Sequence, residues 1–209
     1  MLVKFYYLIL DSSKNLFRTK GTVSTFLLSM ILSVISFFSL EGFLFLTHMQ
    51  QKMNNSLEKE TDFIEIQMSK GPIIVMNFFK IALFLLSTVL ILLTVGTIKK
   101  SFKQFLVIQE EDYKIKALLG ENLVCLKLFY AFQIVLFSLL PIFLGSIVGK
   151  KIFYESIIKT IQLGMFSEDV NSYNGNTLFL SIVLLVVFLY LFVSSFISSD
   201  KKIKAFIYG

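Results

Sequence analysis

The chain has few charged residues for its length. Only 16% of its 209 residues are Asp, Glu, Lys or Arg, whereas 56% are hydrophobic. Soluble domains carry about 25% charged residues, and one compact core in a chain of this length covers only part of such an apolar surface. The composition therefore argues against a soluble domain and favours a protein that exposes apolar side chains to lipid.

Cysteine and histidine are almost absent. The single cysteine, Cys125, excludes an intramolecular disulfide framework and a cysteine-built metal site, and we expect it to be a packing residue. The single histidine, His48, has no carboxylate cluster or nucleophile at a usable spacing and is expected at the membrane interface. The sequence thus predicts no catalytic residue, no metal and no cofactor on this chain.

Long apolar blocks dominate the sequence instead. A helix needs about 20 apolar residues to cross a hydrocarbon core of about 30 Å, and backbone in lipid must hydrogen-bond to itself. We therefore predict an all-α integral membrane protein with four transmembrane helices. The first block is too long for the apolar region of a signal peptide, so we expect it to be retained. The predicted spans are 22–48, 72–98, 123–149 and 178–199.

The distribution of positive charge predicts the orientation of these helices. Thirteen Lys and Arg residues lie before the first span, around the connection between the second and third, or after the fourth, and six lie on the other side. The positive-inside rule then places both termini in the cytoplasm and the chain in the cell membrane. Anionic lipid head groups account for the net charge of +6, and no nucleic-acid partner is expected.

The segments outside the spans are short. Residues 1–21 predict an amphipathic helix lying on the cytoplasmic face. The two extracellular segments, 49–71 and 150–177, are too small to fold as independent domains. Pro72 marks the end of the first one, because proline suits the first turn of a helix. Residues 200–209 form a short cytoplasmic tail.

The cytoplasmic connection 99–122 combines strong charge with a helical apolar pattern that includes Leu118 and Leu119. We predict an extension of the second transmembrane helix, a break near Glu110, and a short helix that stops at Gly120, a common helix-ending residue.

The run 112–120 in this connection resembles the segment before the third helix of FtsX/MacB-type (type VII) ABC transporter permeases. Asp112 stands at the acidic position of that pattern, Ile115 at an isoleucine, Lys116 at the basic position and Gly120 at the glycine. The resemblance identifies the connection as a coupling loop that transmits motion from an ATPase. Its coupling residues would be Glu110, Glu111, Asp112, Lys114, Ile115, Lys116, Gly120 and Glu121.

Two further segments resemble the same family. The stretch 139–149 is similar to the glycine-rich end of the family's third helix, and 13–20 is similar to its Asn-Leu-x-Arg-x-Lys lead into the first. Three features depart from the family: the pair 121–122 is not small, segment 49–71 replaces a large extracytoplasmic domain, and tail 200–209 is reduced. The missing domain favours a bacterium with a single membrane.

The resemblance implies a short-form permease subunit that works as a homo- or heterodimer with a cytoplasmic ABC ATPase. ATP and Mg would be held by that partner. The chain agrees, because its nearest P-loop-like string, Gly145 to Lys150, is one residue short and lacks the hydroxyl residue. The expected cargo is an amphipathic peptide, lipid or hydrophobic toxin, exported or removed from the membrane.

Two sets of residues within the spans stand out. Gly145 and Gly149 form a small-xxx-small pair that permits close helix contact, unless they are simply tolerated glycines. Glu41 and Lys80 are ionisable groups inside the membrane, which are costly there. They can pair with each other or line a substrate path, and Lys80 can instead reach the head groups. Gln133 is expected to hydrogen-bond between helices.

Two other functions remain open on the sequence. One is a stand-alone immunity or membrane-interaction protein that has no ATPase. The other is an FtsX-like regulator of cell-wall hydrolases, although the short extracellular segments offer such a hydrolase little surface.

Overall fold

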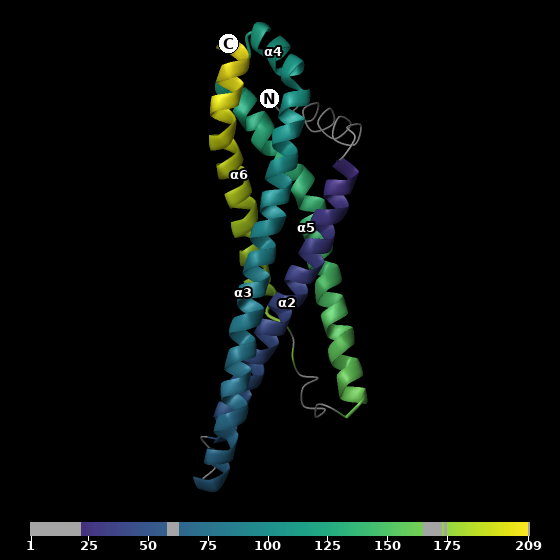
Figure 1. Cartoon of the computed structure of the whole chain (residues 1–209), viewed down its shortest axis with the longest axis vertical. Helices are drawn as coiled ribbons and strands as arrows, with labels where there is room; N and C mark the ends of the chain where they lie inside the picture. Colours follow the sequence, from purple (N-terminus) through teal and green to yellow (C-terminus); the bar gives the residue numbers. More distant parts are fainter. Residues whose placement is uncertain (1–21, 58–62, 165–172, 174, 209) are drawn as a thin grey trace. The chain divides into compact units, whose positions relative to one another are not determined.

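The computed structural model describes residues 22–57, 63–164, 173 and 175–208, so the predicted helix at 1–21 lies outside the described residues. The described part of the chain is helical and contains no strand. Its helices are α2 (Thr22–Leu57), α3 (Phe63–Ile108), α4 (Glu110–Leu118), α5 (Leu123–Gln162) and α6 (Thr177–Tyr208) (Figure 1).

Four of these helices, α2, α3, α5 and α6, are long and apolar enough to cross a membrane. Many of their large apolar side chains are exposed, for example Ile74 and Phe78 on α3 and Ile182 on α6. Lipid contact requires exposed apolar side chains of this kind. The prediction of an all-helical chain with four helices long and apolar enough to cross a membrane is confirmed for the described residues, and it indicates a multi-pass membrane protein.

The helices extend beyond the predicted spans. α2 continues to Leu57 and α3 begins at Phe63, so most of the segment expected as a polar connection is helical. Pro72 consequently lies inside α3 rather than in its first turn. Most of residues 49–57 are polar, so the apolar stretch of α2 ends before them. Their side chains are mainly unbranched or otherwise compatible with a helix, so the helix itself continues.

The connection between α3 and α5 contains the predicted break and short helix. Gln109, with φ −91° and ψ 13°, separates α3 from α4. The last turn of α4 closes when the amides of Gly120 and Glu121 donate to the carbonyls of Ala117 (3.0 Å) and Lys116 (3.1 Å). Gly120 has φ +85°, a conformation that glycine adopts without a Cβ penalty. α4 therefore has a defined boundary at each end.

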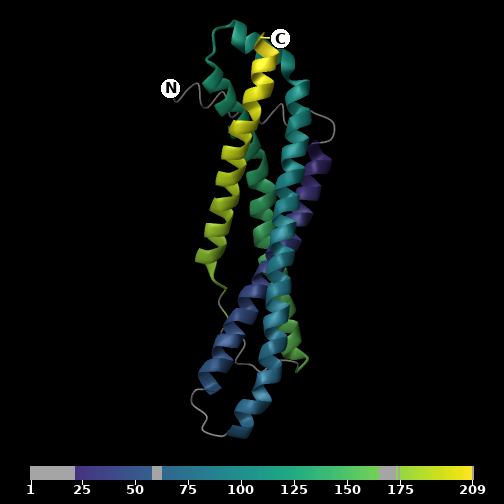
Figure 2. The same ribbon diagram turned by 60° about the vertical axis from the view of Figure 1, so that its left-hand side comes forward.

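The chain divides into two compact units. Unit 1 comprises the described residues within 1–31, 93–143 and 179–209, and unit 2 comprises those within 32–92 and 144–178. Figures 1 and 2 show α4 at the same end of unit 1 as the last turns of α6.

The core of unit 1 is aromatic. Phe102 on α3 is buried and contacts Tyr130 and Phe137 on α5 edge-on, with ring centroids 6.5 and 5.2 Å away. The Lys99 ammonium on α3 donates a hydrogen bond to the Ser194 hydroxyl on α6. These contacts hold α3, α5 and α6 together around the end of the unit that carries α4.

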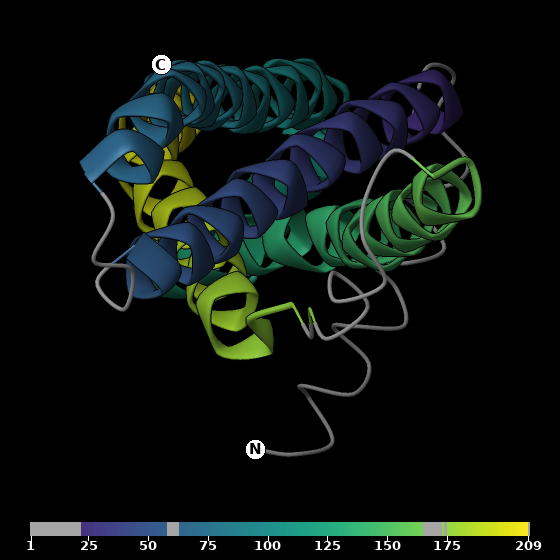
Figure 3. The ribbon, with the colours of Figure 1, turned by 90° about the horizontal axis from the view of Figure 1, so that it is seen from below.

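In unit 2, α2 contacts α3 and α5 (Figure 3). The Phe43 ring on α2 lies 5.3 Å from Phe84 on α3. Phe45 on α2, Phe153 on α5 and Tyr173 are members of one buried apolar cluster. Tyr173 thus belongs to the core of this unit, although it lies outside the helices.

Candidate functional site

Glu41 is fully buried on α2 and anchors a chain of hydrogen bonds in unit 2. The Tyr173 hydroxyl donates to Glu41 Oε2 at 3.0 Å. The Tyr154 hydroxyl, on α5, donates to the backbone carbonyl of Tyr173 at 3.1 Å, and the Gly175 amide donates to the Tyr154 oxygen at 2.6 Å. We call Glu41, Tyr154, Tyr173 and Gly175 the Glu41 centre. It ties α2, α5 and the residues before α6 to one another.

The backbone at Gly175 passes close to the Glu41 carboxylate. A Cβ atom at this position would lie 2.9 Å from Glu41 Oε2 and 3.4 Å from the Tyr154 hydroxyl oxygen. A side chain at position 175 would therefore require the Glu41 carboxylate to shift.

Aromatic rings surround the Glu41 centre. The Phe45 and His48 rings lie 5.5 and 5.6 Å from the Tyr173 ring. Burial, reinforced by the charge of Glu41 and by the hydrogen bond to it, raises the pKa of Tyr173 above its ordinary value of 10.0. The Tyr173 hydroxyl therefore stays protonated and serves as a donor.

The Glu41 centre has the character of a structural clamp. Among the described residues, Glu41 Oε1 and His48 Nδ1 are buried without a hydrogen-bond partner. The described part of the chain holds no group of three or more His, Cys, Asp or Glu side chains that could bind a metal. The hydrogen bonds of the centre fix the backbone at Gly175.

Lys80 and Glu41 have separate partners. The Lys80 ammonium on α3 donates to Gln50 Oε1 on α2 at 2.7 Å, whereas Glu41 accepts from Tyr173. The ion pair considered from the sequence is therefore not formed. Lys80 is half-buried, and its hydrogen bond to a neutral amide satisfies the ammonium without a counter-charge.

Gly145 and Gly149 both lie against the backbone of α2. A Cβ at Gly145 would lie 2.4 Å from Ser33 Cβ, and one at Gly149 would lie 2.6 Å from the Val34 carbonyl oxygen. Separations this short mean that the α5 backbone contacts α2 directly at these positions.

The predicted coupling residues lie on and just after α4, in unit 1. Glu111, Asp112, Lys114 and Ile115 are exposed, as are Gly120 and Glu121 beyond the helix end. The Glu110 carboxylate and the Lys114 ammonium form an (i, i+4) ion pair at 2.8 Å. We call these six exposed residues together with Leu118, which is 87% exposed, the α4 surface.

The opposite side of α4 is anchored to α5. Tyr113 is 1% exposed, and its ring meets Phe129 edge-on with centroids 6.2 Å apart. The Lys116 ammonium lies over the Phe129 ring, 3.8 Å from the centroid. The apolar residues Leu118 and Leu119 are exposed, so the anchor of α4 is aromatic and is not the leucine pair of the sequence pattern.

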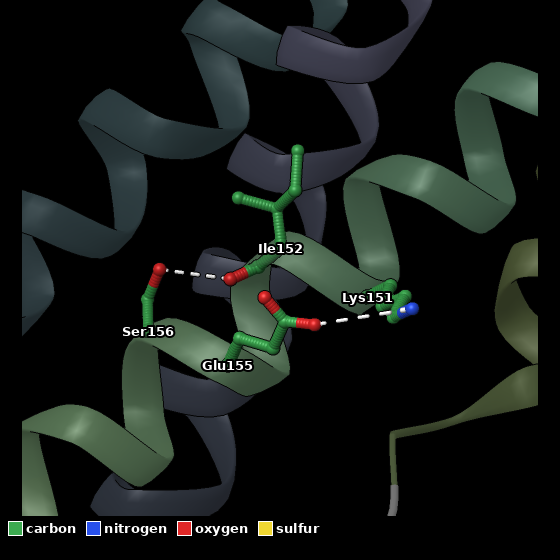
Figure 4. Close-up of polar contacts among 4 residues, drawn as sticks. All are labelled: Lys151, Ile152, Glu155 and Ser156. Carbon is green, nitrogen blue, oxygen red and sulfur yellow. Dashed lines mark hydrogen bonds and ion pairs between the residues drawn. The ribbon is translucent and has the colours of Figure 1, made fainter.

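Charges near the far end of α5 satisfy one another locally. Lys151 and Glu155 form an exposed (i, i+4) pair at 4.0 Å, and the Ser156 hydroxyl donates to the Ile152 carbonyl at 2.8 Å (Figure 4). These contacts stay within one helix, and no second helix contributes to them.

Two expectations about single residues are wrong. Cys125 was expected to pack, but it is exposed at the start of α5. Gln133 was expected to bridge two helices, but its Oε1 is buried with no hydrogen-bond partner in the described part of the chain. Residue type alone does not reveal which side of α5 faces the interior.

Comparison with known proteins found no matching family model, no matching curated protein and no matching solved structure. Functional inference for this chain therefore starts from its own residues.

Proposed function

We propose that this chain is the permease subunit of an FtsX/MacB-type ABC transporter. A separate cytoplasmic ABC ATPase drives it, and two permease subunits form a homo- or heterodimer. Its cargo is an amphipathic peptide, a lipid or a hydrophobic toxin, removed from or exported through the membrane of a single-membrane bacterium. The observation that carries the proposal is α4, a short charged helix set between two membrane-spanning helices.

α4 has the properties that a coupling element needs. It has a boundary at Gln109, a closed last turn at Gly120 and an aromatic anchor at Tyr113, so it can move with α3 and α5 as a rigid piece. Its α4 surface offers charges of both signs together with an exposed leucine. Such a mixed surface suits a protein partner.

The charge distribution supports a cytoplasmic location for α4. Lys99, Lys100 and Lys103 precede it on α3, and Lys127 follows it on α5. By the positive-inside rule this end of the helices faces the cytoplasm, where ATP and Mg are available to the partner ATPase.

A detergent pull-down of the tagged chain tests this function. The wild type is compared with Glu111→Lys combined with Asp112→Lys, which reverses charge on the α4 surface, and with Lys151→Glu, an exposed residue of unit 2, as the control. We expect wild type and control to retain an ATPase subunit that carries a P-loop, and the α4 variant to lose it. An intact dimer with no ATPase bound would contradict the proposal and favour the stand-alone membrane protein.

A further inference from the structure

A cavity of about 450 Å³ lies between α4 and α5 in unit 1. Residues from both helices line it, and two of them, Phe129 and Gln133, belong to the membrane-spanning part of α5. α4 lies outside the membrane-spanning segments. The cavity is therefore placed where an apolar span gives way to a polar connection, which is the depth of lipid head groups.

Two residues that line the cavity each carry a buried polar atom that has no hydrogen-bond partner within the described part of the chain. These atoms are the Tyr113 hydroxyl and Gln133 Oε1, and both residues are 1% exposed. A buried polar group without a partner is destabilising, so two of them on residues that line one cavity need a reason. Burial, reinforced by the nearby Tyr130 and Asp112, raises the pKa of Tyr113, so its hydroxyl remains a donor. Gln133 Oε1 is an acceptor.

The charged groups of the lining balance each other. Lys116 supplies a half-buried ammonium held over Phe129, and Asp112 supplies an exposed carboxylate. A ligand with a net negative charge would meet Asp112 unfavourably, and one with a net positive charge would meet Lys116 in the same way. The lining therefore favours a ligand that carries both signs and is neutral overall.

We propose that this cavity binds the zwitterionic phosphate–ammonium head group of a phosphatidylethanolamine-type lipid. The phosphate accepts hydrogen bonds from the Tyr113 hydroxyl and the Lys116 ammonium at the α4 side. The ammonium donates to Gln133 Oε1 at the α5 side and is attracted by the Asp112 carboxylate. The Tyr113 hydroxyl then gains an acceptor and Gln133 Oε1 gains a donor. Both hydrogen bonds are charge-assisted.

Apolar residues at the same cavity account for the rest of such a lipid. Ile115 and Leu119 also line it, and they are 55% and 79% exposed. Acyl chains attached to a head group in the cavity can cover these side chains as they return to the bilayer. The proposal does not depend on an ATPase partner, because it concerns contacts of this chain with lipid alone.

The test is native mass spectrometry of the delipidated full chain in detergent. It is titrated with short-chain phosphatidylethanolamine, phosphatidylcholine and phosphatidylglycerol of equal chain length, and with free phosphoethanolamine. Methylation in phosphatidylcholine removes every N–H donor that Gln133 could accept from. We expect one saturable site that binds phosphatidylethanolamine at least about tenfold more tightly than phosphatidylcholine, which corresponds to one charge-assisted hydrogen bond.

Three variants separate binding from folding. Tyr113→Phe and Gln133→Met each remove an unpartnered polar group, and each should weaken phosphatidylethanolamine binding about tenfold. The same variants should raise the melting temperature of the lipid-free chain, because no unpartnered group is then left buried. Lys114→Gln changes an exposed charge on the same helix that does not line the cavity, and it should bind as the wild type does.

The outcomes are distinct. Equal binding of phosphatidylethanolamine and phosphatidylcholine would overturn the proposal, and so would unchanged binding in Tyr113→Phe and Gln133→Met. An equal loss in Lys114→Gln would overturn it as well. Free phosphoethanolamine that binds as tightly as the lipid would support the head-group chemistry and assign the site to a soluble ligand. If the pull-down captured no ATPase, the expected lipid binding would be unchanged.

Discussion

Glu41 of the Glu41 centre and the carboxylates of the α4 surface are chemically alike, but the chain uses them differently. Glu41 is fully buried and accepts a hydrogen bond from a residue 132 positions away. Glu111 and Asp112 are exposed, and Glu110 pairs with Lys114 on the next turn of its own helix. A buried carboxylate fixes its surroundings, because it must be hydrogen-bonded, whereas an exposed one is available to a partner. Changes in unit 2 should therefore affect stability, and changes on the α4 surface should affect binding.

The largest loss of stability is expected from Gly149→Leu. Even a Cβ would lie 2.6 Å from the Val34 carbonyl oxygen, and overpacking of this kind lowers the free energy of unfolding by about 3 kcal/mol. Thermal unfolding in detergent measures the effect. Gly96→Leu is the matched control, since a Cβ there has no neighbour within 4 Å. A similar loss of stability in both variants would show that any glycine-to-leucine change in these helices is destabilising, and that contact with α2 is not the cause.

A smaller loss is expected from Glu41→Leu, which leaves the Tyr173 hydroxyl buried without its acceptor. The free energy of unfolding should fall by about 2 kcal/mol, the cost of such an unpaired group. Glu41→Gln keeps an acceptor oxygen and should lose less than half as much. If Gln and Leu were equally destabilising, the hydrogen bond to Tyr173 would not be what the carboxylate contributes.

Alkaline pH should weaken the fold through its buried tyrosines. The pKa of Tyr113 and that of Tyr173 are raised by burial above 10.0 in the folded chain. As the pH rises through 10 the unfolded chain therefore releases protons that the folded chain retains, and the decrease in the free energy of unfolding steepens toward about 1.4 kcal/mol per pH unit for each group. Unfolding at pH 9 to 11 measures this slope. Tyr173→Phe should make it shallower. An unchanged slope in this variant would contradict the assignment of the effect to Tyr173.

The smallest effect on stability is expected on the α4 surface. Lys114→Ala removes an (i, i+4) ion pair whose side chains are 48% and 34% exposed. Pairs of this kind contribute about 0.3–0.5 kcal/mol. Thermal unfolding should hardly change, while retention of the ATPase in a pull-down should decrease. A marked loss of stability would mean that α4 is part of the core and not an exposed docking element.

The sequence predicts much of the fold because membrane insertion depends on local composition. The four apolar blocks and the glycine that ends α4 can be found without tertiary information. The ends of the long helices cannot be found in this way, since the residues before Leu57 are polar and are still helical. The start of the second transmembrane helix was also predicted wrongly from Pro72. This residue lies inside α3, because a proline can be tolerated inside a long membrane helix.

The candidate sites were only partly predictable. The close packing of Gly145 and Gly149 follows from their spacing, which places both on one face of a helix. The partner of Glu41 does not, because Tyr173 lies in a different part of the sequence and only tertiary packing brings it near. The anchoring role of Tyr113 was also missed. Tyr113 lies at helical spacing from apolar residues of the connection, but this spacing is only a weak indication of burial, because tyrosine occurs on exposed faces as well.

Site-specific cross-linking tests the central claim most directly, namely that the α4 surface binds an ATPase. The chain has a single cysteine, so Cys125→Ser provides a background for one new thiol. Leu118→Cys places it on the α4 surface, and Leu163→Cys places it at a 71% exposed position beyond the end of α5. In cell membranes, we predict that a short cross-linker joins an ABC ATPase to position 118 and not to position 163. Cross-linking of the ATPase at neither position, with both variants at wild-type levels in the membrane, would contradict the account.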